Sequence, residues 1–273
     1  MTLVERIKLT FEVLKEKNEA AFIPFITLGD PTPSFSVKIA KDLIEGGADI
    51  IELGIPFSDP VADGPTIQAS TNRAISQGMN TDLAFELAKK IRKIDGKIPL
   101  LFLTYYNIII QRGIKNFFKD CSLSDVDGVI IVDLPVEEAD SALKTAKSQN
   151  INLIFIVAPS TSDQRLNMVL EKAEGFLYIV SLYGTTGVRT SLQEITKETI
   201  KRIIKQAKGK IPCCVGFGIS KPEHVSEVVR AGADGVIVGS AIVDIISKYE
   251  ELKNGVLEKV KLYTKEMKEA TKQ

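Results

Sequence analysis

The stretch DIIELGIPFSDPVADGP, residues 49–65, joins a short apolar run to a loop stiffened by glycine and proline. Within the run stands Glu52, where a strand buried on both faces normally carries another aliphatic side chain. A carboxylate there loses its hydration unless chemistry uses it or nearby backbone N–H groups satisfy it. Asp63 follows eleven positions later in the loop. The pair therefore suggests acid and base catalysis, with a Glu satisfied by local backbone as the alternative.

Seven more apolar runs of this kind, rich in Val, Ile, Leu and Phe, lie along the chain. The eight expected strands are 21–27, 49–53, 98–103, 128–132, 151–157, 176–181, 211–215 and 235–238. Segments with helical spacing separate them, for example 34–45, 81–94, 137–148, 163–173, 193–207 and 222–230. Continuous apolar strands alternating with helices are typical of a parallel sheet covered on both faces. We therefore predict an α/β fold, a single (β/α)8 TIM barrel domain over residues 1–273, with a doubly wound open sheet as the alternative.

Each end of the chain adds a helix beyond the eight units. The N-terminal helix has an apolar face made of Leu3, Ile7, Phe11 and Leu14. The C-terminal helix has one made of Val256, Val260, Tyr263 and Met267. We expect both helices to pack on the barrel without a catalytic role. The longest intervals between strands follow 49–53 and 176–181, where we expect extended loops or extra helices that carry function.

Charge and cysteine content exclude several classes of function. Lys plus Arg and Asp plus Glu number 35 each, so no net field favours nucleic acid or an anionic membrane as partner. The cysteines Cys121, Cys213 and Cys214 lack metal-site spacing, and His224 is the single histidine, so we expect no metal. We expect buried thiols in a reducing compartment and an exposed His224 at a helix start. With no secretory signal and no membrane-length apolar stretch, we expect a cytoplasmic protein.

Several polar residues follow the predicted strands, and the active site of such a barrel lies at the C-terminal ends of its strands. Besides Glu52 and Asp63, these candidates are Asp30, Asp133, Tyr178 and Ser240. Glycine-rich segments at 184–187, 216–220 and 239–241 follow the last three strands. Glycine permits close backbone approach, and N–H groups at a helix start stabilise a dianion. We therefore predict a phosphate site, with ordinary turn glycines as the alternative; the dinucleotide fingerprint and the Walker A sequence are absent.

Five motifs, in order along nearly the whole chain, match one family. They are FIPFITLGDP at 22–31, the acidic run at 52–65 continued by TIQ, VDLP at 132–135, GFGIS at 216–220 and GSAIV at 239–243. On these motifs the chain resembles the α subunit family of tryptophan synthase. The resemblance implies retro-aldol cleavage of indole-3-glycerol phosphate to indole and glyceraldehyde 3-phosphate, with no metal and no cofactor in this chain. It also implies a pyridoxal-phosphate-containing β subunit as partner, in an α2β2 assembly, that joins the indole to serine.

The same resemblance implies residue roles. Glu52 is the acid/base at the glycerol side, and Asp63 faces the indole N–H and stabilises positive charge. We expect the apolar strand to raise the pKa of Glu52 towards neutrality, while Asp63 in a loop stays ionised. The implied substrate contacts are Phe22, Leu103, Tyr105, Ile130, Tyr178, Thr186, Gly187, Phe217, Gly218, Ile237, Gly239 and Ser240. The implied surface for the β subunit includes Asp59, Pro60 and Asn107.

The chain departs from the family pattern in one loop, since Thr185 stands where the family commonly has Val before the Thr that contacts the loop Asp. Two rival functions remain. One is a non-catalytic subunit that activates its partner, which the retention of Glu52, Asp63 and Thr186 disfavours. The other is a sugar-phosphate isomerase on the same barrel, which the lack of a histidine at a strand end disfavours.

Overall fold

The parallel sheet of the barrel is the central feature of the fold. The computed structural model describes residues 5–180, 194–216, 218–253 and 255–272. Its strands are β1 (Ala21–Thr27), β2 (Ile51–Gly54), β3 (Leu100–Thr104), β4 (Gly128–Ile131), β5 (Asn152–Ile154), β6 (Ile156–Val157), β7 (Leu177–Val180), β8 (Cys213–Gly216) and β9 (Gly235–Val238). They pair in parallel in the order β5-β4-β3-β2-β1-β9-β8-β7-β6.

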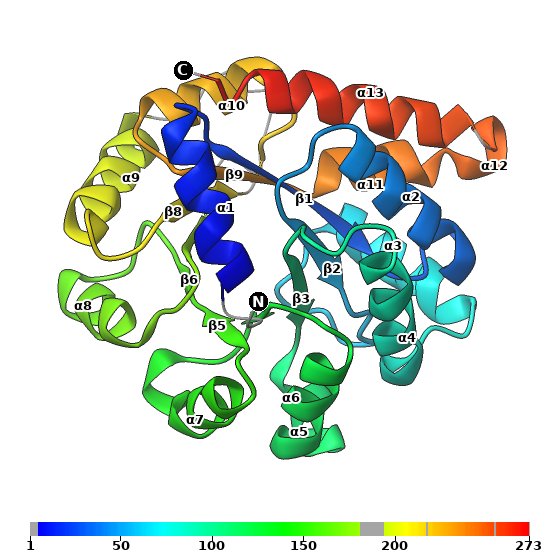
Figure 1. The fold of residues 1–273 in the computed structure, drawn as a ribbon, viewed down its shortest axis with the longest axis horizontal. Helices are drawn as coiled ribbons and strands as arrows, with labels where there is room; N and C mark the ends of the chain where they lie inside the picture. The colour runs from blue at the N-terminus through cyan, green and yellow to red at the C-terminus, as the bar shows by residue number, and fades with distance from the viewer. Residues whose placement is uncertain (1–4, 181–193, 217, 254, 273) are drawn as a thin grey trace.

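The two ends of this strand order belong to one apolar run. β5 and β6 are separated by the single residue Phe155, so the run that we predicted as the fifth strand pairs with β4 through its first part and with β7 through its second. The sheet therefore curls round on itself, and the helices lie around its outside (Figure 1). The predicted TIM barrel is confirmed, and the open-sheet alternative is excluded.

Helices follow the strands throughout the described residues. They are α1 (Glu5–Glu16), α2 (Pro33–Glu45), α3 (Pro65–Ser76), α4 (Thr81–Arg92), α5 (Tyr106–Arg112), α6 (Ile114–Leu123), the 3-10 helix η1 (Val136–Glu138), α7 (Asp140–Ser148), α8 (Asp163–Lys172), α9 (Glu194–Ala207), α10 (Pro222–Arg230), α11 (Ser240–Ser247), α12 (Tyr249–Leu252) and α13 (Gly255–Glu269). The long interval after β2 contains an extra helix, α3. The sequence predicts either an extended loop or an extra helix there. The loop after β7 lies outside the described residues.

Helix α1 closes the N-terminal mouth of the barrel. Its apolar side chains join an interior cluster composed of Ile7, Phe11, Leu14, Ala21, Ile23, Ile50, Leu101, Ile130, Ile154, Phe176, Tyr178, Cys214 and Ile237. The rings of Phe11 and Phe176 meet edge to face at 6.0 Å between centroids. This packing fills the barrel interior at the end where the strands begin.

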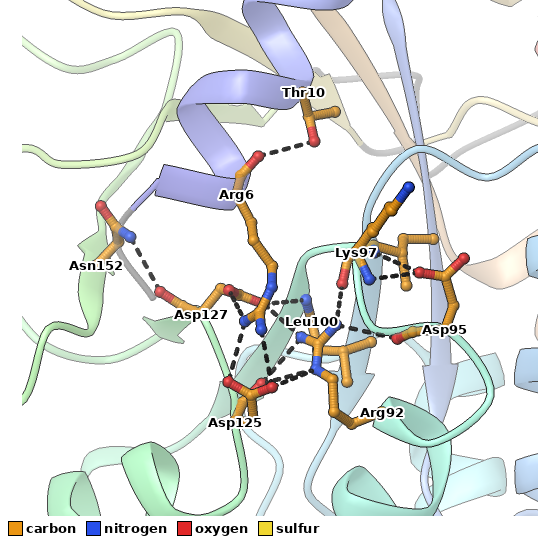
Figure 2. A network of polar contacts seen from close by, with 10 residues as sticks. Arg6, Thr10, Arg92, Asp95, Lys97, Leu100, Asp125, Asp127 and Asn152 are labelled. Carbon is orange, nitrogen blue, oxygen red and sulfur yellow. Dashed lines mark hydrogen bonds and ion pairs between the residues drawn. The ribbon is translucent and has the colours of Figure 1, made fainter. Parts of the chain in front are cut away.

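A network of ion pairs fixes α1 at that mouth (Figure 2). The guanidinium of Arg6 donates to Asp125 and Asp127, at 2.8 Å in the shortest contact with each. Asp127 is fully buried and also accepts hydrogen bonds from Arg92 at 2.7 Å and from the Leu100 N–H at 2.8 Å. Each buried carboxylate oxygen therefore has a partner, as burial of a charge requires. The network holds α1 against the first residue of β3 and against the residues that precede β4. These segments lie about a hundred residues after α1 in the sequence.

Two further expectations can be compared with the structure. Cys121, Cys213 and Cys214 are buried free thiols, as predicted. The expectation of an exposed His224 is wrong, because only 9% of its surface is accessible. His224 lies on the inward face of α10 beside Val225 and Val228, and its Nδ1 accepts the Ser220 N–H at 3.4 Å. Its position at a helix start misled the prediction, since the inward face of this helix begins in its first turn.

Candidate active site

Glu52 is a buried carboxyl inside an apolar strand. It lies in β2 opposite Phe25 of β1 and Leu101 of β3, with 1% of its surface exposed. Its Oε2 atom has no hydrogen-bond partner among the described residues. The alternative of a Glu satisfied by nearby backbone groups therefore does not account for this oxygen. A buried polar atom without a partner is costly and marks a site where function competes with stability.

This environment changes the acidity of Glu52. Burial, reinforced by the charge of Asp63, raises the pKa of Glu52 from 4.5 to about 8. Loss of hydration disfavours the charged form, and a nearby carboxylate disfavours it further. The expected rise of the pKa towards neutrality is confirmed. Near neutral pH the group holds a proton that it can give to a substrate and take back.

Asp63 approaches from the loop between β2 and α3 and is held by Tyr105. The Tyr105 hydroxyl donates to Oδ2 of Asp63 at 3.0 Å and accepts the N–H of Ala62 at 3.0 Å. Burial raises the pKa of the Asp63 carboxyl, and the hydrogen bond from Tyr105 opposes that rise. Tyr105 thus stabilises the ionised form of Asp63. The two carboxyls have unlike surroundings, one apolar and one hydrogen-bonded, which is how enzymes separate an acid from an anion.

Several of the predicted apolar contacts lie inside the barrel. Ile130, Tyr178 and Ile237 belong to the interior cluster, and the partly buried Leu103 packs against it. The negative charge of Glu52 raises the pKa of the buried Tyr178 hydroxyl, after the larger effect of burial. Tyr178 is therefore close enough to Glu52 for the two groups to interact electrostatically. These side chains therefore make the interior of the barrel apolar on the side that Glu52 shares.

Phe22 does not face the barrel interior. Successive strand residues face opposite sides, and on β1 Ala21 and Ile23 face the interior while Phe22 packs in the outer layer under the helices. Phe25, next on the inner face, stands opposite Glu52. Its ring is so close to Gly54 that an added Cβ there would meet it at 2.7 Å. Phe25 is the aromatic residue that the sequence reasoning missed; alternation along β1 places it on the other face from Phe22, and its register opposite Glu52 identifies that face as the inner one.

The predicted phosphate residues that can be placed surround the ends of β8 and β9. Gly239 directly precedes α11, and Ser240 is its exposed first residue. Gly218 is exposed and has a φ of +71°, a left-handed conformation that favours glycine. The first N–H groups of a helix lack partners within the helix, so the start of α11 can bind an anion. Thr186, Gly187 and Phe217 lie outside the described residues.

Two other acidic candidates are engaged in structural contacts. Asp133 accepts the N–H of Tyr106 at 2.7 Å and so stabilises the start of α5. Asp30 is buried and receives two hydrogen bonds from Arg73, at 2.8 and 2.7 Å. Asp30 is thus engaged through both oxygens, and the exposed Asp133 through Oδ1. Glu52 and Asp63 are thus the acidic residues suited to chemistry among the candidates.

The predicted partner residues lie at the surface. Asp59 and Asn107 are exposed, and Pro60 is half-buried between Asp59 and the exposed Val61. Asp59 accepts the hydroxyl of Ser58 at 2.6 Å. The loop that bears Asp59 and Pro60 also bears Asp63, which contacts Tyr105.

In the described part of the chain, no three His, Cys, Asp or Glu side chains gather in a way that could hold a metal ion. Across the same residues no helix combines the length and the apolar character needed to cross a bilayer.

Known proteins resemble this chain over nearly its whole length. The family described as "Tryptophan synthase alpha chain" matches residues 11–272. The tryptophan synthase alpha chain of Methanocaldococcus jannaschii is 52% identical over 247 residues, 90% of this chain and 86% of that protein. The alpha chain of Arabidopsis thaliana is 42% identical over 96% of this chain and 94% of that one.

Solved structures agree in fold. Tryptophan synthase subunit alpha from Legionella pneumophila superposes with a TM-score of 0.88 at 36% identity, covering 99% of this chain and 98% of that one. A chain from a structural study of the tryptophan synthase α2β2 complex of Pyrococcus furiosus gives 0.84 at 39% identity, covering 92% and 98%. Sequence and structure thus point to the same group of proteins: this chain belongs to the tryptophan synthase alpha chain family.

Proposed function

We infer that this chain is a carbon–carbon lyase of tryptophan biosynthesis, which cleaves indole-3-glycerol phosphate to indole and glyceraldehyde 3-phosphate. The observation that carries the inference is the Glu52 carboxyl, buried in β2 with its Oε2 unpartnered and its pKa raised to about 8. Such a group costs stability, and carboxyls with strongly raised pKa values cluster at functional sites. A carboxyl that holds its proton near neutral pH suits a reaction that must protonate carbon.

Cleavage of the carbon–carbon bond needs three charge changes. The indole carbon that bears the side chain takes up a proton, the ring N–H tolerates positive charge, and the adjacent hydroxyl loses its proton as the aldehyde forms. Glu52 serves the proton transfers at the glycerol side. Its position within β2, paired with β1 and β3, fixes it rigidly to the barrel, which preserves its alignment with the reacting carbon.

Asp63 stabilises the positive charge on the indole ring. Its carboxylate accepts the Tyr105 hydroxyl through Oδ2, which leaves Oδ1 able to accept the ring N–H. Asp63 lies on the loop before α3, whereas Glu52 lies in β2. Asp63 can therefore approach the N–H edge of the indole ring while Glu52 acts at the glycerol side. The two carboxyls therefore have separate tasks.

Apolar side chains hold the indole and glycines hold the phosphate. The apolar walls of the indole site are Phe25, Leu103, Ile130, Tyr178 and Ile237. At the other side of the mouth, the start of α11 at Gly239 and Ser240, with Gly218 nearby in the fold, receives the phosphate through backbone N–H groups. Thr186, Gly187 and Phe217 remain predicted contacts of the same substrate.

A tryptophan synthase β subunit is the partner of this chain. The similarity to a chain from the Pyrococcus furiosus α2β2 complex supports that partner. We propose the same α2β2 stoichiometry, with Asp59, Pro60 and Asn107 in the contact and pyridoxal phosphate bound by the β subunit alone. Family membership agrees with a reaction that uses no cofactor on this chain. A cytoplasmic location remains a prediction from the sequence.

An indole-release assay with the purified chain, with and without a β subunit, tests this function. We expect the chain alone to release indole from indole-3-glycerol phosphate, and the β subunit to increase the rate. Stimulation of the β subunit by a chain that itself releases no indole in either condition would instead support the non-catalytic alternative. Isomerisation of a sugar phosphate without indole release would support the second rival.

A further inference from the structure

Asp63 is attached to the first turn of α3. It precedes Gly64, the residue that caps this helix. The side chain of Gln68, one turn into the helix, donates to the backbone oxygen of Asp63 at 2.8 Å, and the Gln68 N–H donates to the oxygen of Gly64 at 2.9 Å. A shift of α3 therefore moves the Asp63 backbone with it.

Two polar contacts dock α3 on the C-terminal end of β1. The hydroxyls of Thr27 and Ser70 lie 2.6 Å apart and are buried. One turn further along the helix, Arg73 donates through Nε and Nη2 to the two oxygens of Asp30, at 2.8 and 2.7 Å. Asp30 is 1% exposed, so its charge depends on Arg73 for compensation. Two parallel hydrogen bonds fix orientation as well as distance.

The same strand also supports Glu52. In the parallel pairing of β1 with β2, Phe25 stands opposite Glu52, two residues before Thr27. Glu52 is thus fixed to β1 by the sheet, and Asp63 is fixed to β1 through α3. The separation of the two carboxyls depends on how α3 sits on β1.

We propose that Asp30 and Arg73 are positioning residues that hold Asp63 in register with Glu52 for the lyase reaction. The proposal rests on the roles of Glu52 and Asp63 proposed above. Neither positioning residue touches the substrate. Their ion pair fixes the position of the first turns of α3 relative to β1. The Arg73 side chain is 37% exposed, so the pair contributes little net stability, but its two parallel hydrogen bonds define one geometry. A displacement of about 1 Å at a catalytic group can lower the rate by about a hundredfold.

A kinetic cycle with Arg73→Met and Asp63→Asn tests the proposal. Steady-state release of indole from indole-3-glycerol phosphate is measured for the wild type, each single variant and the double variant, below the unfolding temperature of all four. We expect Arg73→Met to lower kcat by about tenfold, with KM changed by less than about twofold. In the Asp63→Asn background the same substitution should change kcat by less than about twofold, because the group that it positions has lost its function.

Two further variants separate positioning from folding. Arg6→Met removes a guanidinium that donates to two carboxylates at the opposite mouth of the barrel (Figure 2), and we expect a lower melting temperature with an unchanged kcat. Ser70→Ala removes the second contact of α3 but keeps the ion pair. We expect it to lower kcat by a smaller factor than Arg73→Met, again only when Asp63 is present. It serves as the test if Arg73→Met fails to fold.

The outcomes are distinguishable. An equal loss of kcat from Arg73→Met in both backgrounds would overturn the positioning role, because the effect would not pass through Asp63. An unchanged kcat in both Arg73→Met and Ser70→Ala, with a large loss in Asp63→Asn, would overturn it while leaving the proposed function intact. Normal kinetics of Asp63→Asn itself would overturn the role of Asp63 in the proposed function and the positioning role together.

Discussion

The Tyr105 hydroxyl lies 3.0 Å from Oδ2 of Asp63 and donates a hydrogen bond to it, while accepting the N–H of Ala62. One side chain from the end of β3 thereby fixes both the backbone and the carboxylate of the loop that follows β2. The hydrogen bond also favours the ionised form of Asp63, which the developing charge on the indole ring requires.

Tyr105→Phe removes this hydrogen bond and keeps the ring, which lies 5.1 Å from that of Phe57 between centroids. We expect kcat for indole release to fall by about tenfold, the effect of losing one hydrogen bond to a charged group. Tyr106→Phe removes a hydroxyl from the neighbouring position and should leave kcat unchanged. Wild-type kcat in Tyr105→Phe would show that the hydroxyl does not assist Asp63.

Gly54→Ala should disturb the indole pocket through Phe25. The added Cβ would meet two ring atoms of Phe25 at 2.7 Å, so the ring must move. We expect kcat/KM for indole release to fall by about tenfold and the free energy of unfolding to fall by about 1–3 kcal/mol. Gly96→Ala is the matched control, because nothing lies within 4 Å of its new Cβ. Equal kinetics in the two variants would remove Phe25 from the pocket.

Gly239→Val should weaken phosphate binding, because a branched side chain obstructs the approach of a dianion to the start of α11. We expect the KM for indole-3-glycerol phosphate to rise by about tenfold while kcat stays near wild type. The smaller Gly239→Ala change is milder, since its Cβ would make ordinary contact with Phe25 at 3.4 Å. A lower kcat with unchanged KM in Gly239→Val would contradict a phosphate site here.

Glu52 should make the stability of the fold depend on pH. Its pKa is about 8 in the folded chain and near 4.5 in the absence of burial, so the folded state binds the proton more tightly. The contribution of this proton to stability is present below pH 4.5 and is lost as the pH rises to about 8. Urea unfolding of the wild type should therefore lose free energy, on the order of a few kcal/mol, between these pH values relative to Glu52→Gln.

The exposed Glu12 provides the control for this measurement. Glu12→Gln should leave the pH dependence of unfolding as it is in the wild type. Parallel pH profiles for the wild type and Glu52→Gln would mean that the folded state does not hold the proton on Glu52.

The barrel was predictable because its signal is local. Each strand is an apolar run short enough to recognise by itself, and the parallel architecture follows from the alternation of such runs with helices. Helix α3 had no such signal. Its buried face consists of Ser70, Thr71 and Ala74, so it shows little apolar spacing and depends on contacts with β1 that the sequence does not display.

The site was predictable in part for the same reason. A Glu inside an apolar strand implies a raised pKa, and the structure confirms it for Glu52. The choice between Phe22 and Phe25 needed more, because alternation along β1 defines two faces without saying which is inside. The register that sets Phe25 opposite Glu52 decides it. The contact of Tyr105 with Asp63 likewise joins the residue after β3 to the loop after β2. Spacing along the chain does not reveal such a contact.

The account depends most directly on proton transfer by Glu52. Single-turnover indole release by Glu52→Gln, together with binding of indole-3-glycerol phosphate measured by calorimetry, tests this claim. We predict a rate at least about a hundredfold below wild type with the dissociation constant changed by less than about threefold, since the shape of the pocket survives while the proton donor is lost. A near-normal rate in Glu52→Gln would contradict the account.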